Sequence, residues 1–99
     1  MAVAEISVVP VGTGSASIST FVVRAVEIVK ASGLKYELSS MGTNVEGEVG
    51  AILSVVGKVH EACFSQGAQR VLTTLKIDDR KDKRLTIDGK KSAVTCKLG

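Results

Sequence analysis

The sequence predicts an α+β domain in which two helices cover one face of a four-stranded antiparallel sheet. Stretches with helical and strand-like apolar patterns follow one another in the order strand, helix, strand, strand, helix, strand. That order is the split βαβ, or ferredoxin-like, βαββαβ sandwich. The length of 99 residues suits a single domain over 1–99. No apolar run is long enough to cross a membrane, so no membrane contact is expected.

A strand and a helix open the chain. Residues 3–11 are rich in β-branched types, which is typical of a strand buried on at least one face. Ser17 or Ser19 can cap the helix that follows, because a serine oxygen accepts hydrogen bonds from the free amides of a first turn. Apolar residues then recur at helical spacing as far as Gly33, and a glycine there commonly ends a helix.

Two short strands should come next. Residues 35–40 alternate between polar and apolar side chains, with Tyr36 and Leu38 on one face. Residues 45–49 would form the partner strand. The chain would reach it through a corner at Gly42-Thr43-Asn44, which is rich in turn-forming residues.

The second half of the chain continues the pattern. Apolar spacing predicts a helix from Val49 that Gly67 closes. Residues 70–77 then read as a fourth strand and 79–85 as a charged loop. Residues 86–98 predict a short C-terminal helix.

The second face of this sheet has no cover in such an arrangement. An apolar open face on so small a protein predicts self-association. Aromatic residues are scarce, with only Phe21, Tyr36 and Phe64, so the core must be aliphatic. The same scarcity argues against an RNA-binding sheet, which needs aromatic side chains on which bases stack.

Charge and cysteine content limit the possible partners and the cellular location of the protein. The net charge is +3, and its excess lies between Lys76 and Lys91, where acids interleave with the bases and cancel much of the field. We therefore expect no nucleic-acid partner. The start of the chain lacks the basic segment of a signal peptide. Cys63 and Cys96 are too few for a disulfide framework, so we expect reduced thiols and a cytoplasmic location.

The segment Met41–Gly47 carries more hydrogen-bonding groups than a plain connection needs. Glu46 is its most informative residue, because a carboxylate on a sheet face can accept from an aminopyrimidine or balance a cation. The plainer alternatives for Glu46 are a solvated strand end or an acid in the first turn of a helix.

The loop 12–17 runs from a strand into a helix start and is rich in glycine and hydroxyl groups. The free amides of such a helix start suit a polar or anionic group. The loop lacks the lysine of a phosphate-binding loop, so the alternative is a plain helix start with a flexible approach.

Catalytic and metal chemistry have little support in the sequence. His60 lies on or beside the apolar stripe of the second helix with Cys63 one turn further, which favours packing roles for both. One histidine and two distant cysteines form no zinc set. No nucleophile–base pair is visible. We therefore expect no enzyme, no catalytic residue and no metal site.

Five segments, spread over nearly the whole chain, are informative together: Glu5–Thr13, Ser17–Ser19, Met41–Gly47, Gly67–Val71 and Lys76–Arg80. In these residues and in their order, the chain resembles the thiamine-binding protein family of small ferredoxin-like proteins. The resemblance implies a cytoplasmic protomer that pairs through its sheets and assembles as a tetramer. It also implies binding of thiamine or its hydroxymethylpyrimidine moiety, with no chemistry and no separate cofactor.

The resemblance further implies, position by position, which residues line the ligand: Ser17, Ser19, Met41, Thr43, Glu46 and Gly47. His60 and Arg70 match family positions and are candidates for structural or interface roles. Family members often carry a tryptophan after the Glu-Gly pair, where this chain has none. Tyr36 and Phe21 are then the nearby rings that could stack on a ligand.

The residues and the family resemblance together suggest two functions. The first is a non-catalytic binding protein for thiamine or hydroxymethylpyrimidine. In it Glu46 accepts from the amine or offsets positive charge, while Thr43 and the serines fix the orientation of the ligand. The alternative is an oligomeric regulatory or structural protein that responds to an anionic ligand near Ser17 and has no affinity for thiamine.

Overall fold

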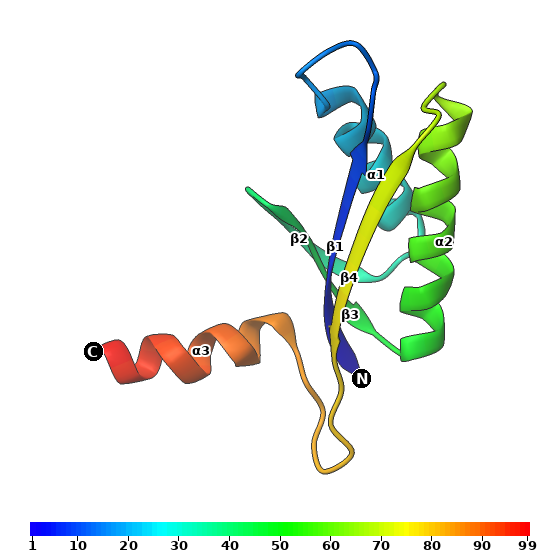
Figure 1. The fold of residues 1–99 in the computed structure, drawn as a ribbon. Helices are drawn as coiled ribbons and strands as arrows, with labels where there is room; N and C mark the ends of the chain where they lie inside the picture. The colour runs from blue at the N-terminus through cyan, green and yellow to red at the C-terminus, as the bar shows by residue number, and fades with distance from the viewer.

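The computed structural model describes residues 1–99 as four strands and three helices (Figure 1). In chain order these are β1 (Ala2–Pro10), α1 (Ser19–Ala31), β2 (Lys35–Ser39), β3 (Gly42–Gly47), α2 (Val49–Ser65), β4 (Val71–Asp78) and α3 (Ile87–Leu98). The strand order across the sheet is β2-β3-β1-β4, and all neighbours are antiparallel. The ferredoxin-like fold class, with its short C-terminal helix, is therefore confirmed. None of the helices combines the length and apolar character needed to cross a bilayer.

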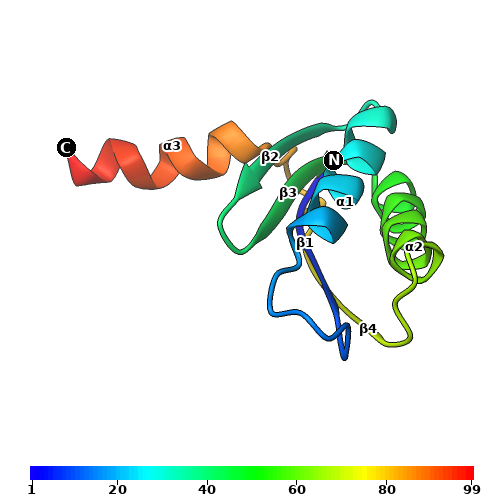
Figure 2. The same cartoon turned by 90° about the horizontal axis from the view of Figure 1, so that it is seen from above.

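Helices α1 and α2 lie on the same face of the sheet, and the core lies between the two layers (Figures 1 and 2). Because side chains alternate along a strand, every second residue of β1 enters this core. The core is aliphatic apart from one thiol: Ala2, Ala4, Ile6, Val8, Val29, Val45, Ile52, Val55, Val59, Cys63 and Ala68. Burial raises the pKa of the Cys63 thiol, which keeps it protonated and unreactive.

The open face of the sheet is more polar than the sequence suggested. Glu5 of β1 lies opposite Lys76 of β4, and their side chains form an ion pair at 3.5 Å. Val9 and Leu72 lie opposite each other further along and are the exposed large apolar residues of these two strands on this face. The expectation of an apolar open face is wrong, because the strands alternate and turn their apolar positions mainly toward the helices.

The turn between β2 and β3 falls earlier than the expected corner at 42–44. It consists of Ser40 and Met41, and Ser39 pairs directly with Gly42. The expected corner is wrong because a two-residue turn already closes the hairpin, which leaves 42–44 free to extend β3. A glycine is required at position 42, where a Cβ atom would lie 2.9 Å from the backbone oxygen of Ile6.

This placement decides which side chains of β3 face the helices. Val45 belongs to the core, so Thr43, two residues earlier, faces the same side. Asn44 and Glu46 face the open side, opposite Glu5 and Val3 of β1.

Helix α1 begins without a side-chain cap. Ile18 occupies the N-cap position, and no side chain accepts a hydrogen bond from the first turn. The expected cap by Ser17 or Ser19 is wrong, because their hydroxyl oxygens lie 3.4 Å from each other instead. The first amides of α1 therefore remain available.

Helix α3 starts on the open face and then leaves the body of the protein (Figures 1 and 2). Leu85 and Ile87 bury Val3 of β1 beneath the start of the helix, whereas Val94 and Leu98 are exposed. The radius of gyration is 14.6 Å, compared with about 13 Å for a compact chain of this length. Helix α3 is thus anchored to the sheet at its N-terminal end and projects from the domain at its C-terminal end.

Candidate functional site

A cavity of about 220 Å³ lies between α1 and the sheet, beside the β2–β3 turn. Its 15 lining residues include ten hydrophobic ones. The others are Ser7, Ser39, Ser40, Gly42 and Thr43, so no charged residue lines the cavity. A largely apolar, uncharged lining of this kind suits a small neutral ring with a few hydrogen-bonding groups.

Thr43 supplies the most informative polar group of the cavity. The residue is only 6% exposed and lines the cavity from β3. No side-chain hydrogen bond involves it, yet no fully enclosed polar atom of the chain lacks a partner. Its hydroxyl is therefore reached through the cavity, where a buried group without a partner favours a ligand that bonds to it.

Met41 forms the outer part of the cavity wall. It sits in the β2–β3 turn, lines the cavity and is 80% exposed. The hydroxyl of Ser39 donates to the carbonyl oxygen of Gly42 at 2.9 Å and fixes the base of this turn. The flexible thioether of Met41 can then adapt to a ligand while its backbone stays in place.

Ser17 and Ser19 adjoin the cavity without lining it. They flank Ile18, which does line it, at the start of α1. The structure thus brings Met41, Thr43 and the start of α1 to one site.

The cavity contains no aromatic wall. Tyr36 and Phe21 pack partly buried against the core, and neither lines the cavity. A bound ring would lie against aliphatic side chains such as Val22 and Val29 of α1.

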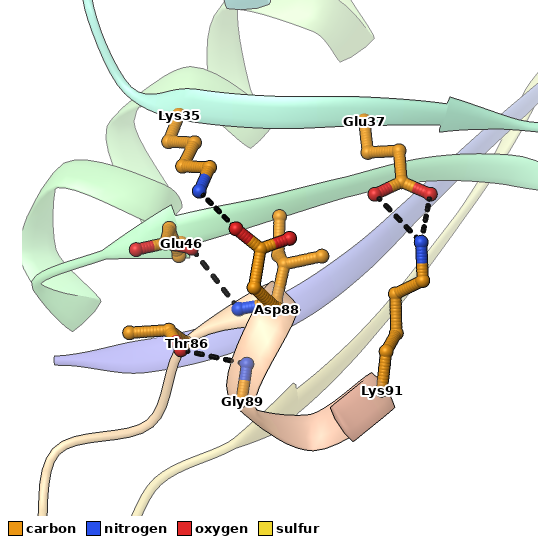
Figure 3. Close-up of polar contacts among 8 residues, drawn as sticks. Lys35, Glu37, Glu46, Thr86, Asp88, Gly89 and Lys91 are labelled. Carbon is orange, nitrogen blue, oxygen red and sulfur yellow. Dashed lines mark hydrogen bonds and ion pairs between the residues drawn. The ribbon is translucent and has the colours of Figure 1, made fainter. Parts of the chain in front are cut away.

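Glu46 lies on the opposite face of the sheet and holds the start of α3 (Figure 3). The side chain is almost fully buried at 7% exposure. The backbone N–H of Ile87, the first residue of α3, donates to Glu46 Oε1 at 3.0 Å. The carboxylate therefore caps the helix and offsets the positive end of its dipole.

Ion pairs hold α3 further along (Figure 3). Lys35 Nζ lies 2.7 Å from Asp88, and Lys91 Nζ lies 3.0 Å from Glu37. The hydrogen bond to Lys35 lowers the pKa of Asp88, and the same bond raises the pKa of Lys35. Because the pKa of Asp88 is lowered, its contribution is present above the unfolded pKa and is lost as the pH falls through the lowered value.

Gly47 is distant from the cavity along β3. It lies four residues beyond Thr43, which is about 13 Å in a strand. A Cβ atom at Gly47 would approach Leu34 Cδ2 to 2.8 Å. The glycine therefore lets Leu34 pack closely against the end of β3.

His60 and Arg70 lie outside the cavity lining. His60 Nδ1 and Thr73 Oγ1 form a hydrogen bond at 2.7 Å between α2 and β4. The His60 ring also meets Phe64 edge-on, with centroids 5.3 Å apart. Arg70 is exposed, and its carbonyl oxygen accepts from Val11 at 2.8 Å.

The site residues that the sequence did not suggest come mostly from α1 and β1, with others from the β2–β3 hairpin and α2. Val22 and Ala25 of α1 face Ile6 and Val8 of β1 across the cavity. One signal in the sequence was available, since Ala25 is a small residue between the larger Val22 and Val29 on the apolar stripe.

Fold and cavity together define a class: a ferredoxin-like domain with a hydroxyl-lined apolar cavity beneath its first helix. The family model described as thiamine-binding protein matches residues 4–95, and the chain belongs to this family. The UPF0045 protein YqgV of Bacillus subtilis is 39% identical over 98 residues, which cover 95% of this chain and 94% of the relative. A UPF0045 protein of Methanothermobacter thermautotrophicus is 47% identical over 83 residues, covering 83% and 84%.

Solved structures agree with this assignment. A hypothetical protein of Methanocaldococcus jannaschii superposes with a TM-score of 0.89 at 41% identity, covering 95% of each chain. A protein of Thermotoga maritima that is named as a candidate thiamine biosynthesis/salvage protein has a TM-score of 0.81 at 30% identity, covering 93% of this chain and 96% of that one. The names of the two UPF0045 relatives, from Bacillus and Methanothermobacter, mention no enzymatic activity.

Proposed function

We propose that this protein binds thiamine or its hydroxymethylpyrimidine moiety, without chemistry, in the cavity beneath α1. The observation that carries the proposal is the buried Thr43 hydroxyl, which has no partner in the chain and faces an apolar cavity. Family membership supports a thiamine-related ligand. The cavity lining offers hydroxyl groups and no acid, base or thiol, which supports binding without catalysis.

Size and charge favour the pyrimidine part of the ligand. The volume of about 220 Å³ lies below the roughly 300–1,000 Å³ of sites for drug-sized molecules. An uncharged lining would leave a thiazolium cation without a partner, and burying an unpaired charge is costly. A single neutral aminopyrimidine ring meets both limits, with its amino or hydroxyl group bonded to Thr43.

Replacing Thr43 by valine tests this proposal. Valine keeps the shape and removes the hydroxyl, so the loss of one hydrogen bond of about 1–2 kcal/mol should weaken binding about fivefold to thirtyfold. The melting temperature should stay the same or rise, because the hydroxyl has no partner in the free protein. Calorimetric titration with hydroxymethylpyrimidine, and separately with thiamine, measures the effect.

Thr43→Ser is the matched control for this substitution. It keeps the hydroxyl and should bind hydroxymethylpyrimidine within about threefold of the wild type. Equal affinities for the valine and serine variants would contradict the proposed hydrogen bond. No saturable heat from folded wild-type protein with either titrant would favour the alternative, an oligomeric regulatory protein without thiamine affinity.

We also propose that the protein self-associates on the side of its open sheet face. The exposed residues Val94 and Leu98 lie seven and eleven positions after Ile87, which places them on the same stripe of α3. A helix of 12 residues is marginal alone, since isolated helices shorter than about 12–15 residues are barely stable in water. A second copy of the chain could cover two exposed apolar surfaces at once: the Val94 and Leu98 stripe of α3, and the Val9–Leu72 pair on the open face of the sheet.

Light scattering after size-exclusion chromatography tests self-association. The wild type should elute as a dimer or tetramer, and the double variant Val94→Glu/Leu98→Glu should shift toward the monomer, because charges would then lie in an apolar contact. Ser92→Glu adds a charge to another side of α3 and should leave the assembly intact. A wild-type protein that stays monomeric at high concentration would refute this proposal.

A further inference from the structure

The start of α1 offers hydrogen-bond donors that the chain does not use. The amides of Phe21 and Val22 donate to the carbonyl oxygen of Ile18 at 3.0 and 3.2 Å. The amides of Ser19 and Thr20 have no acceptor within the chain, and no side chain caps the helix. Free amides at the positive end of a 13-residue helix attract an anion.

Hydroxyl groups surround these amides, and no acid lies near them in sequence. The hydroxyls of Ser17 and Ser19 are 3.4 Å apart, and Ser15 accepts from the Ser17 amide at 3.1 Å. Between Glu5 and Glu27 the only charged residue is Arg24. An anion at the start of α1 would therefore meet donors on several sides and no carboxylate from this stretch of chain.

The cavity connects this helix start to a buried polar group. Ile18 and Val22, from the N-cap and first turn of α1, line the same cavity as Thr43. Thr43 is 94% buried, and its hydroxyl has no partner in the chain and is reached through the cavity, which leaves it free to bond to a ligand there. Ser19, whose amide is free, directly follows Ile18 of the lining, so a ligand that bonds to Thr43 would extend along the cavity toward the start of α1.

We propose that the ligand of the cavity is a phosphate ester, whose neutral ring lies against Thr43 and whose phosphate lies at the start of α1. The phosphate oxygens would accept from the amides of Ser19 and Thr20 and from the hydroxyl of Ser17. This inference rests on the proposed function and adds an anionic group to the ligand class. The uncharged cavity and the electropositive helix start then bind different parts of one molecule.

Ser19→Asp tests the phosphate site. The aspartate places a negative charge at the first position of α1, where it repels a phosphate and yet favours the helix. Wild-type protein should bind hydroxymethylpyrimidine phosphate at least about tenfold more tightly than hydroxymethylpyrimidine. In Ser19→Asp this preference should disappear, while the affinity for the unphosphorylated ring stays within about twofold. Ser19→Asn, which is neutral and of the same size, should keep most of the preference.

Further outcomes separate this inference from the function on which it rests. Inorganic phosphate should compete with the ester and leave binding of the unphosphorylated ring unchanged. Equal wild-type affinities for the two compounds would overturn the phosphate site and leave the cavity function intact. Binding of neither compound by folded protein would overturn both. An intact melting temperature for Ser19→Asp confirms that any lost preference is not a loss of the fold.

Discussion

Replacing Glu46 by alanine should release α3 from the sheet and lower the free energy of unfolding by about 2–3 kcal/mol. The carboxylate is buried and accepts the first amide of α3 at 3.0 Å. Its removal leaves that amide without a partner in a buried place, and a hydrogen bond to a charged group contributes about 1.5–3 kcal/mol. The ion pairs of Lys35 and Lys91 are surface contacts and cannot replace it, because such pairs contribute little.

Urea unfolding measures the stability change, and hydrogen exchange of the α3 amides measures the release of the helix. Glu46→Gln is the matched control, because its amide oxygen can still accept from Ile87; it should retain slow exchange in the first turn of α3. Both variants should bind hydroxymethylpyrimidine and thiamine as the wild type does, since Glu46 faces away from the cavity. If Glu46→Gln weakened thiamine binding far more than pyrimidine binding, the carboxylate would contact the ligand as the sequence suggested.

Replacing Ala25 by leucine should abolish ligand binding, with a loss of affinity of about 100-fold or more. Ala25 lines the cavity from α1, and three added carbon atoms would occupy the space of a bound ring. The fold should tolerate the change to within about 1–2 kcal/mol, because the new side chain enters an existing void rather than a packed region. Titration and thermal unfolding, carried out on the same sample, separate the two effects.

Val23→Leu is the control for this helix. Val23 is exposed and does not line the cavity, so the substitution should change neither binding nor the melting temperature. Wild-type affinity in Ala25→Leu would show that the ligand binds elsewhere, for instance between copies of the chain.

The order of the elements could be predicted because each pattern is local. The alternation of Tyr36 and Leu38 with polar residues identifies β2, and apolar spacing identifies α2. The sequence predicts the hairpin corner too late in the chain because glycine is typical of turns, whereas Gly42 is required by the close approach of the Ile6 backbone. That approach joins residues 36 positions apart, which no local pattern contains.

The site could be predicted only in part for the same reason. Thr43 and Met41 were found through the family resemblance, and both line the cavity. The role of Glu46 depends on the path of the chain after β4, which brings the amide of Ile87 to its carboxylate on the open face. A cavity is also a property of packing across several elements, so the contribution of Ala25 became visible only once α1 lay against β1.

The pairing of β1 has a consequence for the synthesis of the protein. This first strand lies in the middle of the sheet and pairs with β3 and β4, and with no strand next to it in sequence. The edge of β1 that pairs with β4 therefore lacks its backbone hydrogen bonds until Asp78 has been synthesised. Folding of such non-local pairings is comparatively slow, and an unpaired apolar strand is prone to aggregate. The nascent chain thus depends on synthesis as far as β4, and on protection of β1 until then, before the sheet can close.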